Sequence, residues 1–298
     1  MWTEWLSLLD APEERLFWPY LVSALVIALV AALFGRVSLS KELFTRALWW
    51  HPSARADYGL FVVRALISLL LIAPLLVSST VVAVKVVLLC SRAFGAPPLW
   101  PLSALGTTLT YTALLFIASD ATRFGFHLAM HRVPWLWRFH QVHHSAEVMT
   151  PITLYRTHPV EGLLVAVRGV LVTGFVGGAF SWLTRGEAVA LEVLGVNAIA
   201  FALNLAGSNL RHSHVWISFG PLEWLFMSPA QHQLHHGLEP SGHDVNYGSF
   251  LSLWDLLNRS LVRAKTRPTA FGVQRSALNH DPWNVFSLLG GPFRRTRR

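Results

Sequence analysis

The sequence predicts an all-α integral membrane protein, a bundle of transmembrane helices with a histidine-rich helical cap. Three observations lead to this fold class. Hydrophobic residues make up 53% of the 298 residues and charged residues only 13%, whereas a soluble domain has about 25% charged residues. Several apolar runs approach the roughly 20 residues that a membrane-spanning helix needs. Histidines gather in short clusters with the spacing of one helix face.

Five apolar segments are the expected spans. In chain order they are residues 16–34, 59–90, 102–119, 160–180 and 187–206. The second is interrupted by Arg64, Pro74 and Lys85. It is too short for two full crossings of about 20 residues each, so we expect one tilted or kinked crossing there. Residues 181–186 join the last two segments into a hairpin.

The charge distribution predicts an orientation. Residues 1–15 are acidic and the 36–55 loop is basic, with Arg36, Lys41, Arg46 and Arg55, so the positive-inside rule places the loop in the cytoplasm. With one crossing at 59–90, all histidine clusters and the basic tail then face the cytoplasm. The acidic start, with Glu4, also differs from the basic start of a cleavable signal peptide, and we expect none.

The remaining composition excludes some classes of protein. Cys90 is the only cysteine, which excludes an internal disulfide and a cysteine-based metal site. The net charge of +8 is spread over loops and a terminal RRTRR (Arg294, Arg295, Arg297, Arg298). No nucleic-acid fold signature accompanies it, so the sequence argues against nucleic-acid binding.

Three histidine clusters carry the chemistry. The ligand candidates are His127 and His131 in HLAMH, His140, His143 and His144 in HQVHH, and His232, His235 and His236 in HQLHH. On a helix, each cluster directs its imidazoles to one side. The repeated H-Q-x-H-H motif predicts two similar half-sites, and eight ligands suit a pair of metal ions. An imidazole-rich site without thiolate suits iron, copper or zinc.

Competing metal sites fit less well. A structural zinc site usually closes at four ligands and has no redox chemistry. A zinc protease helix would read H-E-x-x-H, but Leu128 stands where that glutamate belongs. A haem with two axial histidines would leave six unexplained. Copper remains open on ligand type alone.

Several further residues are candidate ligands or neighbours of the metals. His212 is the strongest additional ligand, because it follows the returning limb of the hairpin, and His158 and His214 are weaker ones. Asn209 shares a helical face with His212 if the helix continues. Carboxylates and amides that could orient the imidazoles are Asp120, Glu161, Asp244 and Asn246.

These motifs resemble those of the fatty acid hydroxylase/sterol desaturase superfamily. The resemblance covers about residues 113–260 and lies in the order of the three histidine boxes. The local sequence also resembles that of family members in DATRFGFHLAMHRVPWLWRFHQVHHS (120–145), RTHPVEG (156–162), GPLEWLFMSPAQHQLHHG (220–237) and DVNYGSFLSLWD (244–255). Two departures are WDLLNRSL (254–261), which lacks the Gly-Thr that members often have after WD, and His214, where many members have asparagine. GPLEW…SP looks closest to ether-lipid monooxygenases and bacterial sterol-desaturase-like members.

The resemblance implies a non-haem di-iron centre that uses O2 to hydroxylate or desaturate a lipid, such as a fatty acyl, ether-lipid or sterol-like molecule. It carries the ligand role to the eight box histidines and to His212. Electrons would come from a separate donor, a ferredoxin or a cytochrome b5-like protein with its reductase. We expect membrane spans at 1–112, the catalytic core at 113–262 and a basic tail at 263–298. The alternative is a non-catalytic membrane metal-binding or transport protein, whose ligands would lie near the bilayer midplane.

Overall fold

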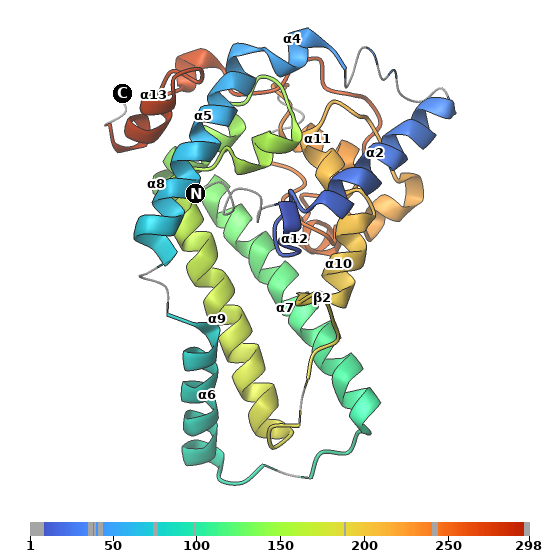
Figure 1. The fold of residues 1–298 in the computed structure, drawn as a ribbon, viewed down its shortest axis with the longest axis vertical. Coiled ribbons are helices and arrows are strands. Elements are labelled where there is room, and N and C mark those ends of the chain that lie inside the picture. The colour runs from blue at the N-terminus through green and yellow to red at the C-terminus, as the bar shows by residue number, and fades with distance from the viewer. Residues whose placement is uncertain are drawn as a thin grey trace.

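The computed structural model of the chain describes residues 9–34, 38, 40, 44–73, 77–97, 99–187, 189–239 and 244–294. The prediction of a mainly helical protein is confirmed. Figure 1 shows two parts: a stem formed by the helices α6, α7 and α9, and a cap of shorter helices at the upper end of the stem. The carboxyl-terminal end of α7 and the amino-terminal end of α9 enter the cap.

The stem helices span Ser79–Phe94 (α6), Ala104–Arg132 (α7) and Pro159–Leu183 (α9). The side chains of Ser78, Ser103 and His158 cap them by accepting backbone N–H groups at their first turns. α7 continues the 102–119 segment without a break for 29 residues. It therefore extends from the stem into the cap, where its last turns carry two of the box histidines.

Two glycines allow α6 and α9 to pack closely. A Cβ atom on Gly174 would lie 2.4 Å from the Cβ of Val82, and one on Gly178 would lie 2.5 Å from the carbonyl oxygen of Ala83. Small residues four apart permit this kind of close backbone approach between helices in membranes. The close α6–α9 contact thus depends on the glycines at positions 174 and 178 of α9.

The 59–90 segment, expected to make one tilted or kinked crossing, forms two helices instead of one continuous helix. α5 spans Pro52–Ile67 and continues as a π-helical turn, η1, over Ser68–Ile72, whereas α6 begins at Ser79. Ser78 opens α6 as its N-cap, and Pro74 lies outside the described residues. Each 16-residue helix is about 24 Å long, and α5 packs against the cap while α6 packs against α9.

The 187–206 segment also differs from its prediction as a full returning span. It contains a small hairpin, β1 (Glu192–Val193) paired with β2 (Val196–Asn197), followed by the eight-residue helix α10 (Ala198–Leu205). Gly195 turns the hairpin with a φ of +80°, and the Asn197 side chain caps α10. Apolar composition alone predicted a helix that these turn residues interrupt.

One helix of the described chain, α9, is long and apolar enough to cross a membrane, and only 17% of its most apolar window is buried. The apolar helix α2 (Trp18–Leu33) corresponds to the expected 16–34 span but is shorter. It packs through Ala24 and Ala28 onto Leu210 and Val215. The charged residues Glu4, Arg36, Lys41, Arg295, Arg297 and Arg298, used in the orientation argument, lie outside the described residues.

The cap is built from short elements. They are α4 (Arg46–Trp49), α8 (Pro134–His144), η3 (Pro151–Tyr155), η4 (Ser208–His212), η5 (Gly220–Trp224), α11 (Pro229–His235), α12 (Leu253–Asn258), η7 (Arg275–Ala277), α13 (Val285–Gly290) and η8 (Gly291–Phe293). Ala56, Leu60, Val142 and Leu288 form a buried cluster where α5, α8 and α13 meet. This packing fixes α8, the helix that carries the second histidine box.

Candidate metal centre

Nine histidines converge in the cap as two groups. The five-histidine group contains His127, His131, His140, His144 and His235, and the four-histidine group contains His143, His212, His232 and His236. Within each group, the candidate ligand atoms all lie within 4.8 Å of one another. The structure thus brings together the eight box histidines and His212, from α7, α8, η4 and α11.

The two H-Q-x-H-H helices each serve both groups. In α8, His140 and His144 join the five-histidine group while His143 joins the other. In α11 the assignment is reversed, because His232 and His236 join the four-histidine group and His235 joins the five-histidine group. On a helix, positions i and i+4 lie to one side of position i+3. The repeat therefore produces two similar half-sites, but neither box builds a half-site alone.

Local sequence sets these helices in place. Val133 is extended and Pro134 opens α8 immediately after α7. Ser228 and Gln231 form a capping box at the start of α11. The carboxylate of Glu223, within GPLEW, accepts from the hydroxyls of Ser218 and Ser228 at 2.7 and 2.8 Å. Since Glu223 is fully buried, it ties the η5 turn to the cap of the third histidine box.

The loop after α11 supplies carbonyl acceptors for two ligands. Nδ1 of His127 lies 2.7 Å from the Tyr247 carbonyl, and Nδ1 of His235 lies 2.7 Å from the Val245 carbonyl. Because a carbonyl oxygen only accepts, both Nδ1 atoms donate and each neutral ring presents a lone pair on Nε2. Asp255 holds this loop by accepting from the backbone of Tyr247 and Gly248 at 2.8 and 2.7 Å.

Two further acceptors orient the imidazoles of α8. The Glu161 carboxylate lies 3.0 Å from Nδ1 of His140, so this expected neighbour of the metals contacts a ligand. The Arg156 carbonyl lies 3.3 Å from Nδ1 of His143. Such outer hydrogen bonds commonly fix the tautomer of metal-bound histidine.

The donor set fits metal ions. Nε2 of His127 lies 3.1 Å from Nε2 of both His140 and His235, and Nε2 of His212 lies 3.2 and 3.1 Å from its counterparts in His143 and His232. Between His127 and His235, lone pairs face each other without a proton to share. An ion about 2.1 Å from each nitrogen explains such spacing. Buried Nε2 atoms of His131, His144 and His236 also have no partner among the described residues.

Burial keeps these candidate ligands neutral. Burial lowers the pKa of His140 and His143 to about 3, and it lowers the pKa of His235 and His236 well below the usual value. At neutral pH the imidazoles are therefore unprotonated, which is the form that binds a metal.

The other candidates lie outside both groups. His158 caps α9 through Nδ1, and its Nε2 lies 3.0 Å from the Leu289 carbonyl. His214 accepts from the Met149 N–H at 3.2 Å. Asn209 lies with His212 in the short helix η4, but its side chain bonds Arg15 instead of a histidine. Asp120 accepts from the 250–254 segment. Asp244 accepts from the Tyr247 hydroxyl. Asn246 bonds backbone groups of α11 and Val262.

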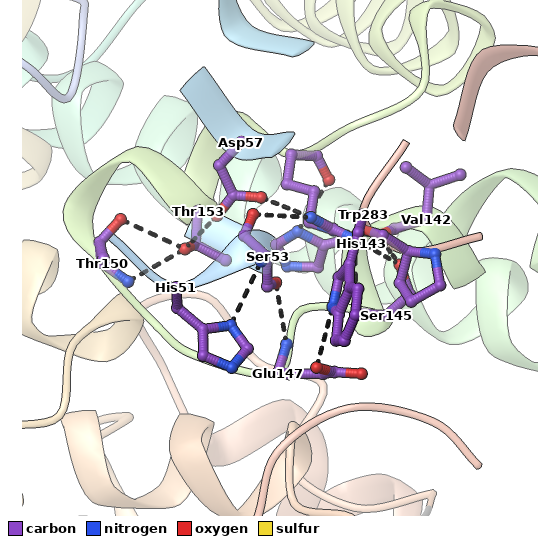
Figure 2. Close-up of polar contacts among 12 residues, drawn as sticks. His51, Ser53, Asp57, Val142, His143, Ser145, Glu147, Thr150, Thr153 and Trp283 are labelled. Carbon is purple, nitrogen blue, oxygen red and sulfur yellow. Dashed lines mark hydrogen bonds and ion pairs between the residues drawn. The ribbon is translucent and has the colours of Figure 1, made fainter. Parts of the chain in front are cut away.

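A buried ion pair fixes Arg156, the residue whose carbonyl lies next to His143. Figure 2 shows Asp57 beside Thr153, whose hydroxyl donates to the Asp57 carboxylate at 2.7 Å. The same carboxylate contacts the guanidinium of Arg156 at 2.6 Å, and both side chains of this ion pair are fully buried. Arg156 also donates to the carbonyls of Val142 and Pro282 and to the Ser145 hydroxyl. The sequence did not predict this pair, although Arg156 stands in the RTHPVEG motif (156–162).

Two cavities adjoin the histidines. One of about 320 Å³ contacts both groups, through His127, His140, His143, His212 and His232. The other, of about 230 Å³, reaches the five-histidine group beside Trp137 and Asp244. The Trp137 ring lies 5.1 Å from that of His131. A small molecule can therefore approach the nitrogens from two sides.

Comparison with known proteins assigns the family. A family model described as fatty acid hydroxylase matches residues 112–260, half of the chain, and includes all nine clustered histidines. The chain belongs to the fatty acid hydroxylase family. This confirms the resemblance read from the histidine boxes.

Several named proteins are similar to this chain over part of its length. Alkylglycerol monooxygenase of Danio rerio is 30% identical over 58% of this chain and 35% of its own length. Ornithine lipid hydroxylase OlsE of Rhizobium tropici is 28% identical over 44% of this chain and 35% of its own. Very-long-chain aldehyde decarbonylase GL1-9 of Oryza sativa subsp. indica is 30% identical over 47% and 49%. The chain thus covers a third to a half of these relatives, and no solved structure matches it.

Proposed function

We propose that this family member is a membrane-bound non-haem di-iron oxidoreductase that uses O2 to hydroxylate a lipid, with desaturation as the variant outcome. The observation that carries the proposal is the pair of adjacent all-histidine groups, one with five and one with four potential ligands. Two redox-active ions held by nitrogen ligands suit the activation of dioxygen better than a closed structural zinc site.

The five-histidine and four-histidine groups would each hold one iron ion, Fe2+ or Fe3+, with the nine histidines as ligands. When bound, the pair supplies oxidation chemistry: R–H, O2, two electrons and two protons give R–OH and water. The chain holds the imidazoles neutral and oriented, through the loop carbonyls, Glu161 and Arg156. Electrons would come from a separate ferredoxin or cytochrome b5-like donor with its reductase.

The stem supports a lipid substrate and a membrane location. Exposed apolar side chains cover its helices, including Leu89, Leu105 and Phe175 at 62%, 68% and 55% exposure. Such a surface suits lipid rather than water, and the lipid-modifying relatives agree. We place the cap on the cytoplasmic side and the catalytic core at 113–262, between amino-terminal spans and a basic tail. Histidines in the cap rather than along the stem favour an enzyme over a transporter.

Metal content tests the proposal directly. Detergent-purified protein prepared with iron under anaerobic conditions should contain about two irons per chain. H235A should lose the ion of the five-histidine group and H232A that of the four-histidine group, each lowering the content by about one. H214N is the matched control, since His214 lies outside both groups, and should keep two. Stoichiometric zinc without iron would contradict the proposal.

Labelled dioxygen tests the reaction. Lipid extracts of cells producing the wild-type protein should contain a lipid that carries one labelled oxygen atom, or one that has lost two hydrogens. The product should disappear with H232A or H235A and persist with H214N. An unchanged lipid profile across all four proteins, in cells supplied with the electron donor, would rule out the oxygenase.

A further inference from the structure

Four arginines line the cavity that adjoins both histidine groups. They are Arg15, Arg123, Arg168 and Arg211, from the segment before α2, from α7, from α9 and from η4. The same cavity is lined by His127, His140 and His212. Four cations from separate elements thus face the space that a substrate of the metal centre would occupy.

No ion pair offsets these charges within the described part of the chain. Arg15 instead donates to the amides of Asn204 and Asn209, and Arg168 donates to the hydroxyl of Thr122 at 3.0 Å. Arg123 and Arg211 lie 5.9 and 5.3 Å from the centre of the Phe250 ring. These neutral partners position the guanidinium groups, and the Asp120 carboxylate offsets only part of the charge of Arg123 and Arg211.

The two nearby carboxylates do not balance the four arginines. Asp120 accepts from the backbone of Phe250 and Leu251 and from the Trp254 indole. Glu161, which lines the cavity, accepts from His140. Even with Asp120 and Glu161 both counted as anions, the four arginines leave an excess of positive charge. The buried Nε atoms of Arg168 and Arg211 also lack a partner in the described ranges.

Gathering these arginines is costly without an anion. Burial, reinforced by Arg211 and Arg123, lowers the pKa of Arg15 to about 9. Like charges gathered in one cavity repel one another. Planar guanidinium groups recognise phosphate and carboxylate through paired hydrogen bonds, so an anion in the cavity would relieve this repulsion.

We propose that the substrate is a lipid with an anionic polar end, a phosphate or a carboxylate, which these four arginines hold beside the metal centre. This deepens the proposed function and rests on it. Because arginines and histidines line one cavity of about 320 Å³, the oxidised carbon is one of those nearest the anion. An apolar cavity of about 290 Å³, with Leu203, Leu222 and Phe226, shares Arg211 and Phe250 with the first and would receive part of the chain.

Binding to purified full-length protein in neutral detergent tests this directly. Native mass spectrometry would compare hexadecyl phosphate, palmitate and hexadecanol, which share a chain length, with inorganic phosphate. Hexadecyl phosphate should bind at least about tenfold more tightly than hexadecanol, because hydrogen bonds to charged groups are strong. Inorganic phosphate should bind at least about a hundredfold more weakly than hexadecyl phosphate, because it lacks the apolar chain. Equal affinity for hexadecanol, or for inorganic phosphate, overturns the proposal.

Variants locate the anion. R123Q and R211Q should each weaken hexadecyl phosphate about tenfold and leave hexadecanol within about twofold. R55Q is the matched control, since Arg55 is exposed on α5, and it should bind like wild type. A loss shared by R55Q would overturn the assignment. Should either cavity variant fail to fold, salt titration of the wild type replaces it: salt should weaken only the anionic lipids.

Iron content and product analysis separate this proposal from the proposed function. An anionic lipid preference without bound iron would leave the binding inference standing and remove the oxygenase. Two irons and oxygenation of neutral lipids alone would do the reverse. In turnover with labelled dioxygen, the oxygen should enter near the anionic end of hexadecyl phosphate or palmitate. Oxidation at the distal methyl end would overturn the proposed placement.

Discussion

The cap and the stem distribute polar and apolar side chains in opposite ways. In the cap, Asp57, Arg156, Glu223 and Gln231 are fully buried, and the nine clustered histidines lie among them. In the stem, the helices α6, α7 and α9 carry exposed leucine, valine and phenylalanine side chains. The cap is therefore polar inside, whereas the stem is apolar outside.

This difference shows how a metal centre can be set at the edge of an apolar bundle. Burial of polar groups in the cap is compatible with a stable fold because hydrogen bonds satisfy them, as for Glu223 and Arg156. The stem helices need no such network and pack by shape, at Gly174 and Gly178. α7 belongs to both parts, which couples the position of His127 and His131 to the stem.

The largest effect should follow from breaking the buried ion pair of the cap. D57N leaves the Arg156 guanidinium buried without its carboxylate partner, and removing one partner of such a pair typically costs about 3–5 kcal/mol. We expect a large loss of stability in thermal unfolding of the detergent-solubilised protein. His143 should also lose its place, because Arg156 supplies its carbonyl acceptor.

The matched control is a surface pair of the same chemistry. Glu147 and Arg275 lie 2.9 Å apart with side chains 26% and 55% exposed, so E147Q should cost no more than about 1 kcal/mol. Equal effects of D57N and E147Q would contradict the view that the cap depends on its buried polar network.

The sequence predicted the parts of the site that depend on local spacing. HLAMH, HQVHH and HQLHH indicated helical faces with histidine, and His212 was singled out from its position after an apolar segment. It could not show that His143 and His140 serve different groups, because that depends on how α8 and α11 meet. The Asp57–Arg156 pair joins residues 99 positions apart. The 187–206 segment was misjudged because its apolar residues concealed the turn at Gly195.

The stem should respond to volume rather than to charge. In G178V the added side chain meets the Ala83 carbonyl and Val86 of α6, and over-packing a tight contact costs about 1–3 kcal/mol. We expect lower thermal stability with iron content per folded chain retained, because the ligands lie in the cap. G169V is the control, since a Cβ there meets nothing within 4 Å; an equal loss in both variants would point away from helix packing.

The outer hydrogen bonds of the ligands should set metal affinity. E161Q replaces the charged oxygen that accepts from His140 by a neutral amide oxygen, a weaker acceptor, and mutation of such a partner typically weakens metal binding by roughly 10- to 100-fold. Chelator titration should therefore remove the ion of the five-histidine group first, with the second ion retained. Simultaneous release of both ions at the wild-type chelator concentration would show that Glu161 does not orient His140.

The smallest effect is expected where a side chain near the site bonds away from it. Y247F removes a hydroxyl that donates to the exposed Asp244 at 2.8 Å, at a cost of about 1 kcal/mol or less. The contact of Tyr247 with His127 uses its backbone carbonyl, which the substitution keeps, and Asp255 still holds that backbone. Iron content should thus remain at the wild-type level, measured beside E161Q under the same chelator. Loss of iron in Y247F would mean that the ring and its hydroxyl, rather than the loop backbone, position the first histidine box. The side-chain polar network of the cap would then itself position the candidate ligands.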